Sequence, residues 1–191
     1  MFCIITVYPN FSLMISPTEQ LSFPIGRAQL PDGLLSAAER TALIQQIAEL
    51  PAQLTVTVQA VGDEYLQHPY RPGGWTGRQV IHHLADSHLN CYCRFRLALT
   101  EDNPTVRLYD EKSWAELPDV ATTPITVSLT LLEALHTRWV MLLHHISEAQ
   151  WQRTFYHPGT KRDFTLDQVL AMYAWHGQHH LAHLKLLLPP N

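Results

Sequence analysis

The stretch TLDQVLAMYAWHGQHHLAHLKLLLPP, residues 165–190, decides the fold that the sequence predicts. It opens with Thr165 and Gln168 at the spacing of a capping box, in which each side chain accepts a hydrogen bond from the other residue's backbone N–H. Apolar residues then recur every three or four positions until two consecutive prolines end the pattern. The sequence therefore predicts a long amphipathic helix from Leu166 to Leu188.

Three segments upstream carry the same helical periodicity. The first starts at a second capping-box pattern, Ser36 to Glu39, and contains Pro51, which can bend it. The next is expected to begin at an N-cap, Thr76, and the last near Val127. The predicted spans are residues 36–58, 76–103 and 127–146, followed by a short helical piece at 147–151.

Two connections complete the pattern. A polar crossover from Tyr109 to Pro124 is long enough to run the length of a bundle, and we expect a short helical turn within it. A turn or small hairpin is expected over Phe155–Phe164.

Four amphipathic helices with one long crossover predict an all-α fold, a four-helix bundle. We expect one bundle domain over residues 23–191 after an extended lead-in over residues 1–22, and the natural start, Met1 or Met14, stays open.

Composition narrows the functional classes. Charged residues make up 16% of the chain, below the roughly 25% of average soluble domains, while 46% are apolar, which argues against disorder. With 13 Lys and Arg against 17 Asp and Glu, the chain lacks the basic excess that binds phosphates, so we expect no nucleic-acid partner. No apolar run reaches the ~18 residues of a membrane span, so we expect no membrane partner either. The three cysteines form neither a disulfide framework nor a CxxC pair, which predicts free thiols in the cytoplasm.

Histidine is the unusual component: the chain has 12, and 10 of them lie on predicted helices. On the last helix, the apolar stripe passes through His176 and His180, one turn apart, so both are expected to face the core. On the 76–103 helix, the stripe through Val80 and Cys91 selects His83 as the inward histidine and leaves His82 and His88 outside it. Three neutral imidazoles from two helices can bind one divalent ion and leave a coordination position open, as catalytic sites do.

Other polar residues near these positions are weaker candidates. The pairs His82/Asp86 and His179/His183 are interpreted as a solvated face, with Asp86 able to orient a ligand imidazole and His183 able to reach the site. His136 lies near the stripe of the 127–146 helix, as a supporting residue or an ordinary buried histidine. Arg94 can bind a substrate carboxylate or form an ion pair. Tyr109 and Asp110, in the crossover, either line a pocket or cap the bundle.

Several segments together resemble a known family. They are FPIG at 23–26, PYRPGGWT at 69–76, QVIHHLADSH at 79–88, YDEKSW at 109–114, FYHP at 155–158 and WHGQHHLAH at 175–183. In this order they resemble the DinB-like superfamily and, within it, the YfiT-type metal-dependent hydrolases, also described as bacillithiol S-transferases. The resemblance covers the chain from about Phe23 to its C-terminus.

The resemblance implies an up-down-down-up bundle, usually a homodimer, that binds one divalent ion such as zinc or nickel through three histidines. Carried over onto this sequence, those ligands are His83, His176 and His180, the residues that the apolar stripes select. The implied activity is transfer of a small thiol, such as bacillithiol, to an electrophile, with the thiol held as a thiolate. Hydrolysis of an amide or ester would use the same open position, and the sequence does not separate the two reactions.

Two readings without catalysis remain beside the enzyme. In one, the metal only stabilises a dimeric, stress-associated bundle that acts as an interaction module. In the other, the histidines are polar core residues that bind no metal. Metal content and turnover of a thiol or an ester distinguish the three.

Overall fold

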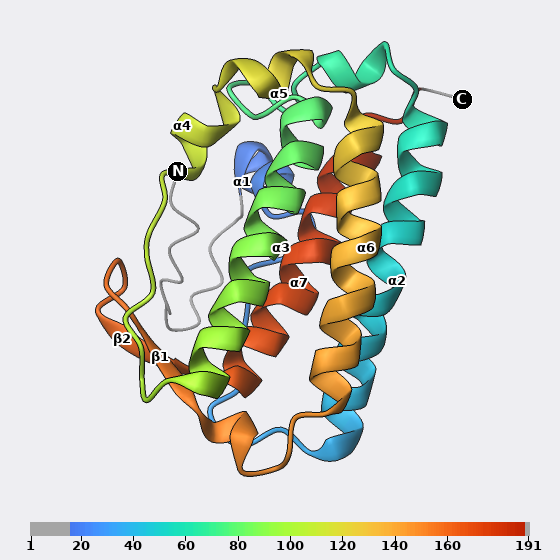
Figure 1. The fold of residues 1–191 in the computed structure, drawn as a ribbon. Coiled ribbons are helices and arrows are strands. Elements are labelled where there is room, and N and C mark those ends of the chain that lie inside the picture. The colour runs from blue at the N-terminus through green and yellow to red at the C-terminus, as the bar shows by residue number, and fades with distance from the viewer. Residues whose placement is uncertain (1–15, 190–191) are drawn as a thin grey trace.

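The computed structural model describes residues 16–189 (Figure 1). Four long helices dominate it, with short helices and one hairpin in their connections. In chain order the helices and strands are α1 (Pro17–Ser22), α2 (Ala37–Val61), a 3₁₀ turn (Tyr65–Gln67), α3 (Gly77–Thr100), α4 (Glu111–Ala115), α5 (Pro118–Thr122), α6 (Ile125–His144), a second 3₁₀ turn (Gln150–Gln152), β1 (Thr154–His157), β2 (Arg162–Thr165) and α7 (Leu166–Lys185).

The long helices form the expected four-helix bundle. α2 packs against α6 and α7, and α3 packs against the same two helices, so α2 and α3 lie diagonally opposite. Figure 1 shows α2 and α7 running in one direction and α3 and α6 in the other, which is the up-down-down-up order. The crossover makes this order necessary, because it carries the chain from the end of α3 back to the end of the bundle where α3 began (Figure 1).

The predicted helix starts are confirmed. Ser36 with Glu39, Thr76 with Gln79, and Thr165 with Gln168 form capping boxes, with both reciprocal hydrogen bonds present in each. Each box satisfies backbone donors that the first helical turn leaves without a partner. None of the helices in the described part of the chain is long and apolar enough to cross a membrane.

Three local expectations need correction. The crossover holds two short helices, α4 and α5, where one turn was expected. α6 ends at His144, so His145 is its C-cap and is not helical. The lead-in, expected to be extended, forms α1 from Pro17 to Ser22, while its first 15 residues, with Met14, lie outside the described residues.

α2 and α7 approach each other closely at Gly177. A Cβ atom at this position would lie 2.5 Å from Leu50 Cδ2, so any larger residue would require the Leu50 side chain or the helices to shift. Gly177 directly follows His176 on α7, so α2 packs closely against the turn of α7 that carries the candidate site.

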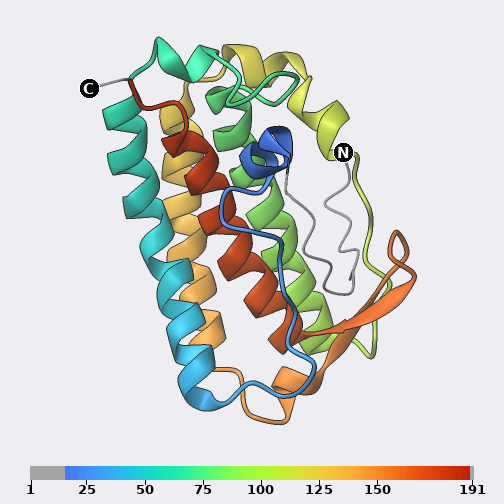
Figure 2. The ribbon, with the colours of Figure 1, turned by 180° about the vertical axis from the view of Figure 1, so that it is seen from behind.

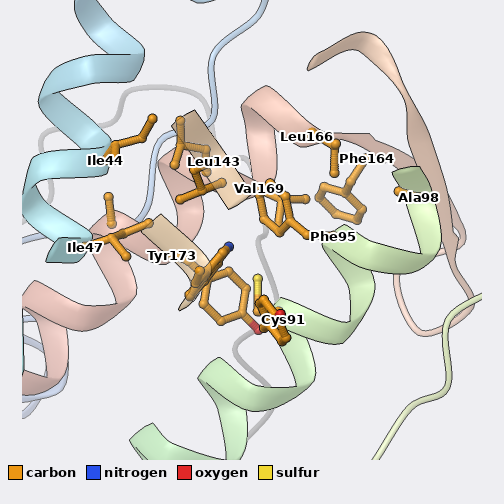
Figure 3. Close-up of a cluster of buried hydrophobic side chains, with 14 of the residues drawn as sticks. Ile44, Ile47, Cys91, Phe95, Ala98, Leu143, Phe164, Leu166, Val169 and Tyr173 are labelled. Atoms are coloured by element: carbon orange, nitrogen blue, oxygen red, sulfur yellow. The ribbon is translucent and has the colours of Figure 1, made fainter. Parts of the chain in front are cut away.

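Buried apolar side chains form two clusters at opposite ends of the bundle. Figure 3 shows the cluster near the hairpin, where Phe95, Leu143 and Val169 meet from α3, α6 and α7. The other cluster, with Leu84 and Leu181, fills the end near the 3₁₀ turn at 65–67. On α3, α6 and α7 the positions between the two clusters hold buried histidines, so the core has a polar layer across its middle.

The segment between α1 and α2 runs along α7 (Figure 2). Gln168 on α7 donates to the Pro31 carbonyl, and the Leu35 N–H donates to the Asp167 carboxylate. Asp167 also accepts two hydrogen bonds from Arg40, Nε–Oδ1 at 2.6 Å and Nη2–Oδ2 at 2.9 Å, and both side chains are almost fully buried. This bidentate pair links the start of α2 to the start of α7. Because both side chains are buried, loss of either charge would leave the other without a counter-charge.

Replacing Arg40 by methionine would leave the Asp167 carboxylate buried without its cation. We expect R40M to lower the free energy of unfolding by about 3 to 5 kcal/mol, because breaking one side of a buried pair strands the other charge. The measurement is urea denaturation followed by circular dichroism. The matched control is E148Q, because Glu148 contacts the same guanidinium but is 77% exposed, and it should cost less than about 1 kcal/mol. Equal losses in both variants would contradict this account.

Candidate metal centre

Three histidines converge in the polar layer of the core. One ring nitrogen each from His83, His176 and His180 lies within 4.8 Å of the others, and all three residues are less than 10% exposed. The Nε2 atoms of His83 and His176 are 3.3 Å apart. The stripe analysis selected these three residues, and the structure brings them together.

Helix geometry explains the convergence. His176 and His180 lie one turn apart on α7, so their rings stand on the same face with centroids 4.6 Å apart. His83 faces them from α3, with its ring centroid 5.4 Å from that of His176 and 4.9 Å from that of His180. Trp75, just before α3, covers His83 at 4.7 Å between ring centroids.

Burial keeps the three imidazoles neutral. It lowers the pKa of His83 to about 3, with a smaller contribution from His179. Burial also holds the pKa of His176 and of His180 well below the ordinary value, and neighbouring histidines lower both further. A neutral imidazole carries a lone pair on one ring nitrogen, which is the form that binds metals.

The donor set fits a divalent ion. Zinc–nitrogen bonds of about 2.0 to 2.1 Å at the tetrahedral angle place two ligand nitrogens about 3.3 Å apart, which is the separation observed between His83 and His176. Imidazole suits zinc, nickel and copper, whereas magnesium and calcium prefer oxygen ligands. Three histidines also leave room for a further ligand from the cavity beside them.

His179, His180 and His183 form a second group of ring nitrogens within 4.8 Å of one another. The sequence analysis placed His179 and His183 on a solvated face, and that interpretation is wrong: they are 4% and 2% exposed. His183 stacks on Tyr70 with ring centroids 3.9 Å apart, and His179 stacks on Trp175 at 4.4 Å. The loop before α3 and the α1 segment therefore bury this face of α7.

His82 and His88 were also expected to point outward, and both are buried. His82 Nδ1 bonds with the Ser128 hydroxyl at 2.8 Å, which joins α3 to α6. His88 is fully buried and contacts both His176 and His136 through hydrogen bonds. The missed signal for His88 is its spacing, because it lies four residues after Leu84 and three before Cys91, both core residues of α3.

A cavity of about 590 Å³ opens beside the three histidines. Arg94, Tyr109 and Tyr173 are among its lining residues, and the Arg94 charge acts on both tyrosine hydroxyls. Burial raises the pKa of Tyr109 to about 12 and raises that of Tyr173 further, so both hydroxyls stay protonated and can donate hydrogen bonds. Further lining residues include Phe23, Arg71, Trp75, Glu111, Lys112 and His157.

The remaining candidates divide into two groups. Arg94 and Tyr109 line the cavity, whereas Asp86 and Asp110 are not among its lining residues. Asp110 is exposed and caps α4, accepting hydrogen bonds from the backbone of Lys112 and Ser113. Asp86 is half-buried, and burial, with some repulsion from Asp119, raises its pKa to about 6.

The sequence analysis did not select Tyr173 or His157 as site residues. The signal for His157 was the FYHP segment, which contains it and resembles the family.

Comparison with known proteins identifies the family and agrees with the fold. A family model described as the DinB superfamily matches residues 46–184. "Putative metal-dependent hydrolase YfiT" of Bacillus subtilis is 49% identical over 164 residues, which cover 86% of this chain and 92% of that protein. "Putative metal-dependent hydrolase OB0782" of Oceanobacillus iheyensis is 48% identical over 165 residues, covering 86% and 94%.

A solved structure is similar over nearly the whole fold. YfiT from Bacillus subtilis, described as a probable metal-dependent hydrolase with an unusual four-helix bundle topology, superposes with a TM-score of 0.85 at 48% identity. The match covers 88% of this chain and 95% of that one. Sequence, topology and the histidine cluster lead to one assignment: the chain belongs to the DinB superfamily, among the relatives of YfiT.

Proposed function

We propose that this protein is a metal-dependent enzyme that transfers a small thiol, of the bacillithiol kind, to an electrophile. The observation that carries the proposal is the placement of three buried, neutral histidine nitrogens at the inner wall of a cavity of about 590 Å³. In this proposal His83, His176 and His180 hold one divalent ion per chain, zinc or nickel. The bound ion would supply the charge that keeps a thiol deprotonated near neutral pH.

The other cavity residues would bind and orient the substrates. Arg94 makes no ion pair with any described residue, so its guanidinium can take a carboxylate of the thiol substrate. Tyr109 and Tyr173 offer protonated hydroxyls toward the same space. Trp75 would exclude water from the face of His83 that it covers.

Hydrolysis is the second candidate reaction. It is favoured by the names of the relatives, which are called metal-dependent hydrolases. The same open position beside the three histidines would serve an amide or ester substrate. The unpaired thiols of Cys91 and Cys93 fit the reducing cytoplasm in which either reaction would take place.

The first test is metal content. Untagged protein loaded with zinc and then dialysed should hold about one ion per chain by elemental analysis, because three converging imidazoles form one site. We expect H176A to lose the ion. H144A removes an exposed histidine from α6 and should keep it. If the unaltered protein holds no zinc or nickel after loading, the proposal is wrong.

The second test is turnover by the metal-loaded protein. We expect conjugation of a carboxylate-bearing thiol to monobromobimane at a rate above the uncatalysed one, with kcat lost in H176A. R94Q should raise KM for this thiol about tenfold, as expected when a charge-assisted hydrogen bond of about 1.4 kcal/mol is lost, and leave KM for 2-mercaptoethanol nearly unchanged. R138Q, on the exposed face of α6, is the matched control.

The outcomes separate the alternatives. Turnover of p-nitrophenyl esters without thiol conjugation would replace thiol transfer by hydrolysis. Metal that raises the melting temperature while neither substrate turns over would leave the stress-associated, non-catalytic bundle as the function.

A further inference from the structure

We infer that two chains of hydrogen-bonded histidines, each starting at a backbone carbonyl, hold His176 and His180 in the tautomer that offers Nε2 to the metal. The inference deepens the proposed function and rests on it. It gives positioning roles to His88, His136 and His183. We call the chain through His88 and His136 the long relay and the chain through His183 the short relay.

The long relay crosses all four helices of the bundle. His136 Nδ1 on α6 lies 2.7 Å from the Ile47 carbonyl oxygen on α2. His136 Nε2 lies 2.9 Å from His88 Nδ1 on α3, and His88 Nε2 lies 3.2 Å from His176 Nδ1 on α7. The planes of the His88 and His136 rings are only 12° apart with centroids 5.0 Å apart, which suits an N–H group pointing at a lone pair in the ring plane.

The carbonyl at one end sets the direction of every bond. A carbonyl only accepts, so His136 must carry its proton on Nδ1 and keep a lone pair on Nε2. That lone pair requires a proton on His88 Nδ1, and the lone pair then left on His88 Nε2 requires a proton on His176 Nδ1. His176 Nε2 is therefore the free lone pair, and it is the atom that lies 3.3 Å from His83 Nε2 in the candidate site.

Pro51 leaves the Ile47 carbonyl open to the relay. In an α-helix the carbonyl of residue i accepts from the N–H of residue i+4, and the residue four positions after Ile47 is Pro51, which has no N–H. The Ile47 carbonyl thus lacks the i+4 donor that an α-helix normally supplies, and Ile47 is buried in the bundle. The His136 N–H supplies the bond that the helix cannot make.

The short relay follows the same logic. His183 Nε2 lies 3.3 Å from the Ser22 carbonyl, which belongs to the last residue of α1 and so has no donor within that helix. His183 must then be protonated on Nε2, and its Nδ1 accepts from His180 Nδ1 at 3.3 Å. His180 Nε2 keeps the lone pair. The stacking of His183 on Tyr70 holds the ring in this place.

Fixing the tautomer matters because the wrong one turns an N–H toward the metal. Partners behind a ligand imidazole set its orientation and its tautomer, and their loss commonly lowers metal affinity about 10- to 100-fold. The short relay also bears on the second histidine group. With His180 Nε2 on the first ion, a second ion shared by His179, His180 and His183 would have to bind His180 Nδ1, which the short relay protonates.

The direct test reads the tautomers in metal-free protein. Two-bond ¹H–¹⁵N correlation spectra distinguish a protonated Nδ1 from a protonated Nε2 in each histidine. We expect Nδ1–H in His136, His88, His176 and His180, and Nε2–H in His183. The opposite tautomer at His176 or His180 would overturn the corresponding relay, and this result does not depend on whether the protein binds metal.

Variants then test the consequence for metal binding, with zinc affinity measured by competition against a chromophoric chelator. H136L removes the acceptor for His88, and H183L removes the acceptor for His180, so each should weaken zinc binding at least tenfold. H136Q can still donate to Ile47 and accept from His88 through its amide, and its affinity should lie closer to that of the unaltered protein. H82L is the matched control, because it also removes a buried, hydrogen-bonded histidine from the core but belongs to neither relay.

The outcomes distinguish failure of the relays from failure of the metal site. Unaltered protein that binds no zinc overturns the proposed function, while the tautomer pattern still decides the relays. Zinc binding that is equal in H136L, H183L and H82L overturns the relays and leaves the metal site standing. Two zinc ions per chain would overturn the short relay. Circular dichroism melting curves of the variants show whether a loss of affinity is instead a loss of fold.

Discussion

A buried neutral imidazole has one N–H group and one lone pair, and the middle of this bundle depends on that constraint. Apolar packing cannot decide which nitrogen of a histidine carries the proton; only its hydrogen-bond partners can. In this core the partners are other histidines, so the choice made by one ring passes to the next. Each relay ends at a backbone carbonyl. A carbonyl accepts hydrogen bonds and never donates them, so it fixes the direction of the other hydrogen bonds in its relay.

The layered core explains how the fold tolerates so many polar side chains. The two apolar clusters at the ends of the bundle supply the packing, and the histidine layer lies between them, away from bulk water. Two contacts join α2 to α7. The Arg40–Asp167 pair links the starts of the two helices, and the close approach at Gly177 brings them together near the site. The histidine layer therefore has packed apolar side chains on both sides, and such support helps to pre-organise a binding site.

Much of this arrangement could be predicted from the sequence, because it follows from local rules. Capping residues and apolar periodicity gave the four long helices, and one-turn spacing along the stripe gave His176 and His180. His88 was missed because the stripe of α3 was traced from Val80 through His83 to Cys91, although the four-residue step from Leu84 also reaches it. The burial of His179 and His183 was missed for another reason. Their burial comes from the loop before α3 and from α1, segments distant in sequence whose packing on α7 no periodicity of α7 encodes.

Pro51 supports the site but lowers the stability of the helix that contains it. A proline inside a helix costs about 3 kcal/mol relative to alanine, so a search for more stable variants would replace it early. The replacement would return an N–H to α2, and this N–H would share the Ile47 carbonyl oxygen with the His136 N–H. A substitution chosen to stabilise the bundle would then alter the hydrogen bond at the start of the long relay. It would do so through a residue whose side chain is not part of the site.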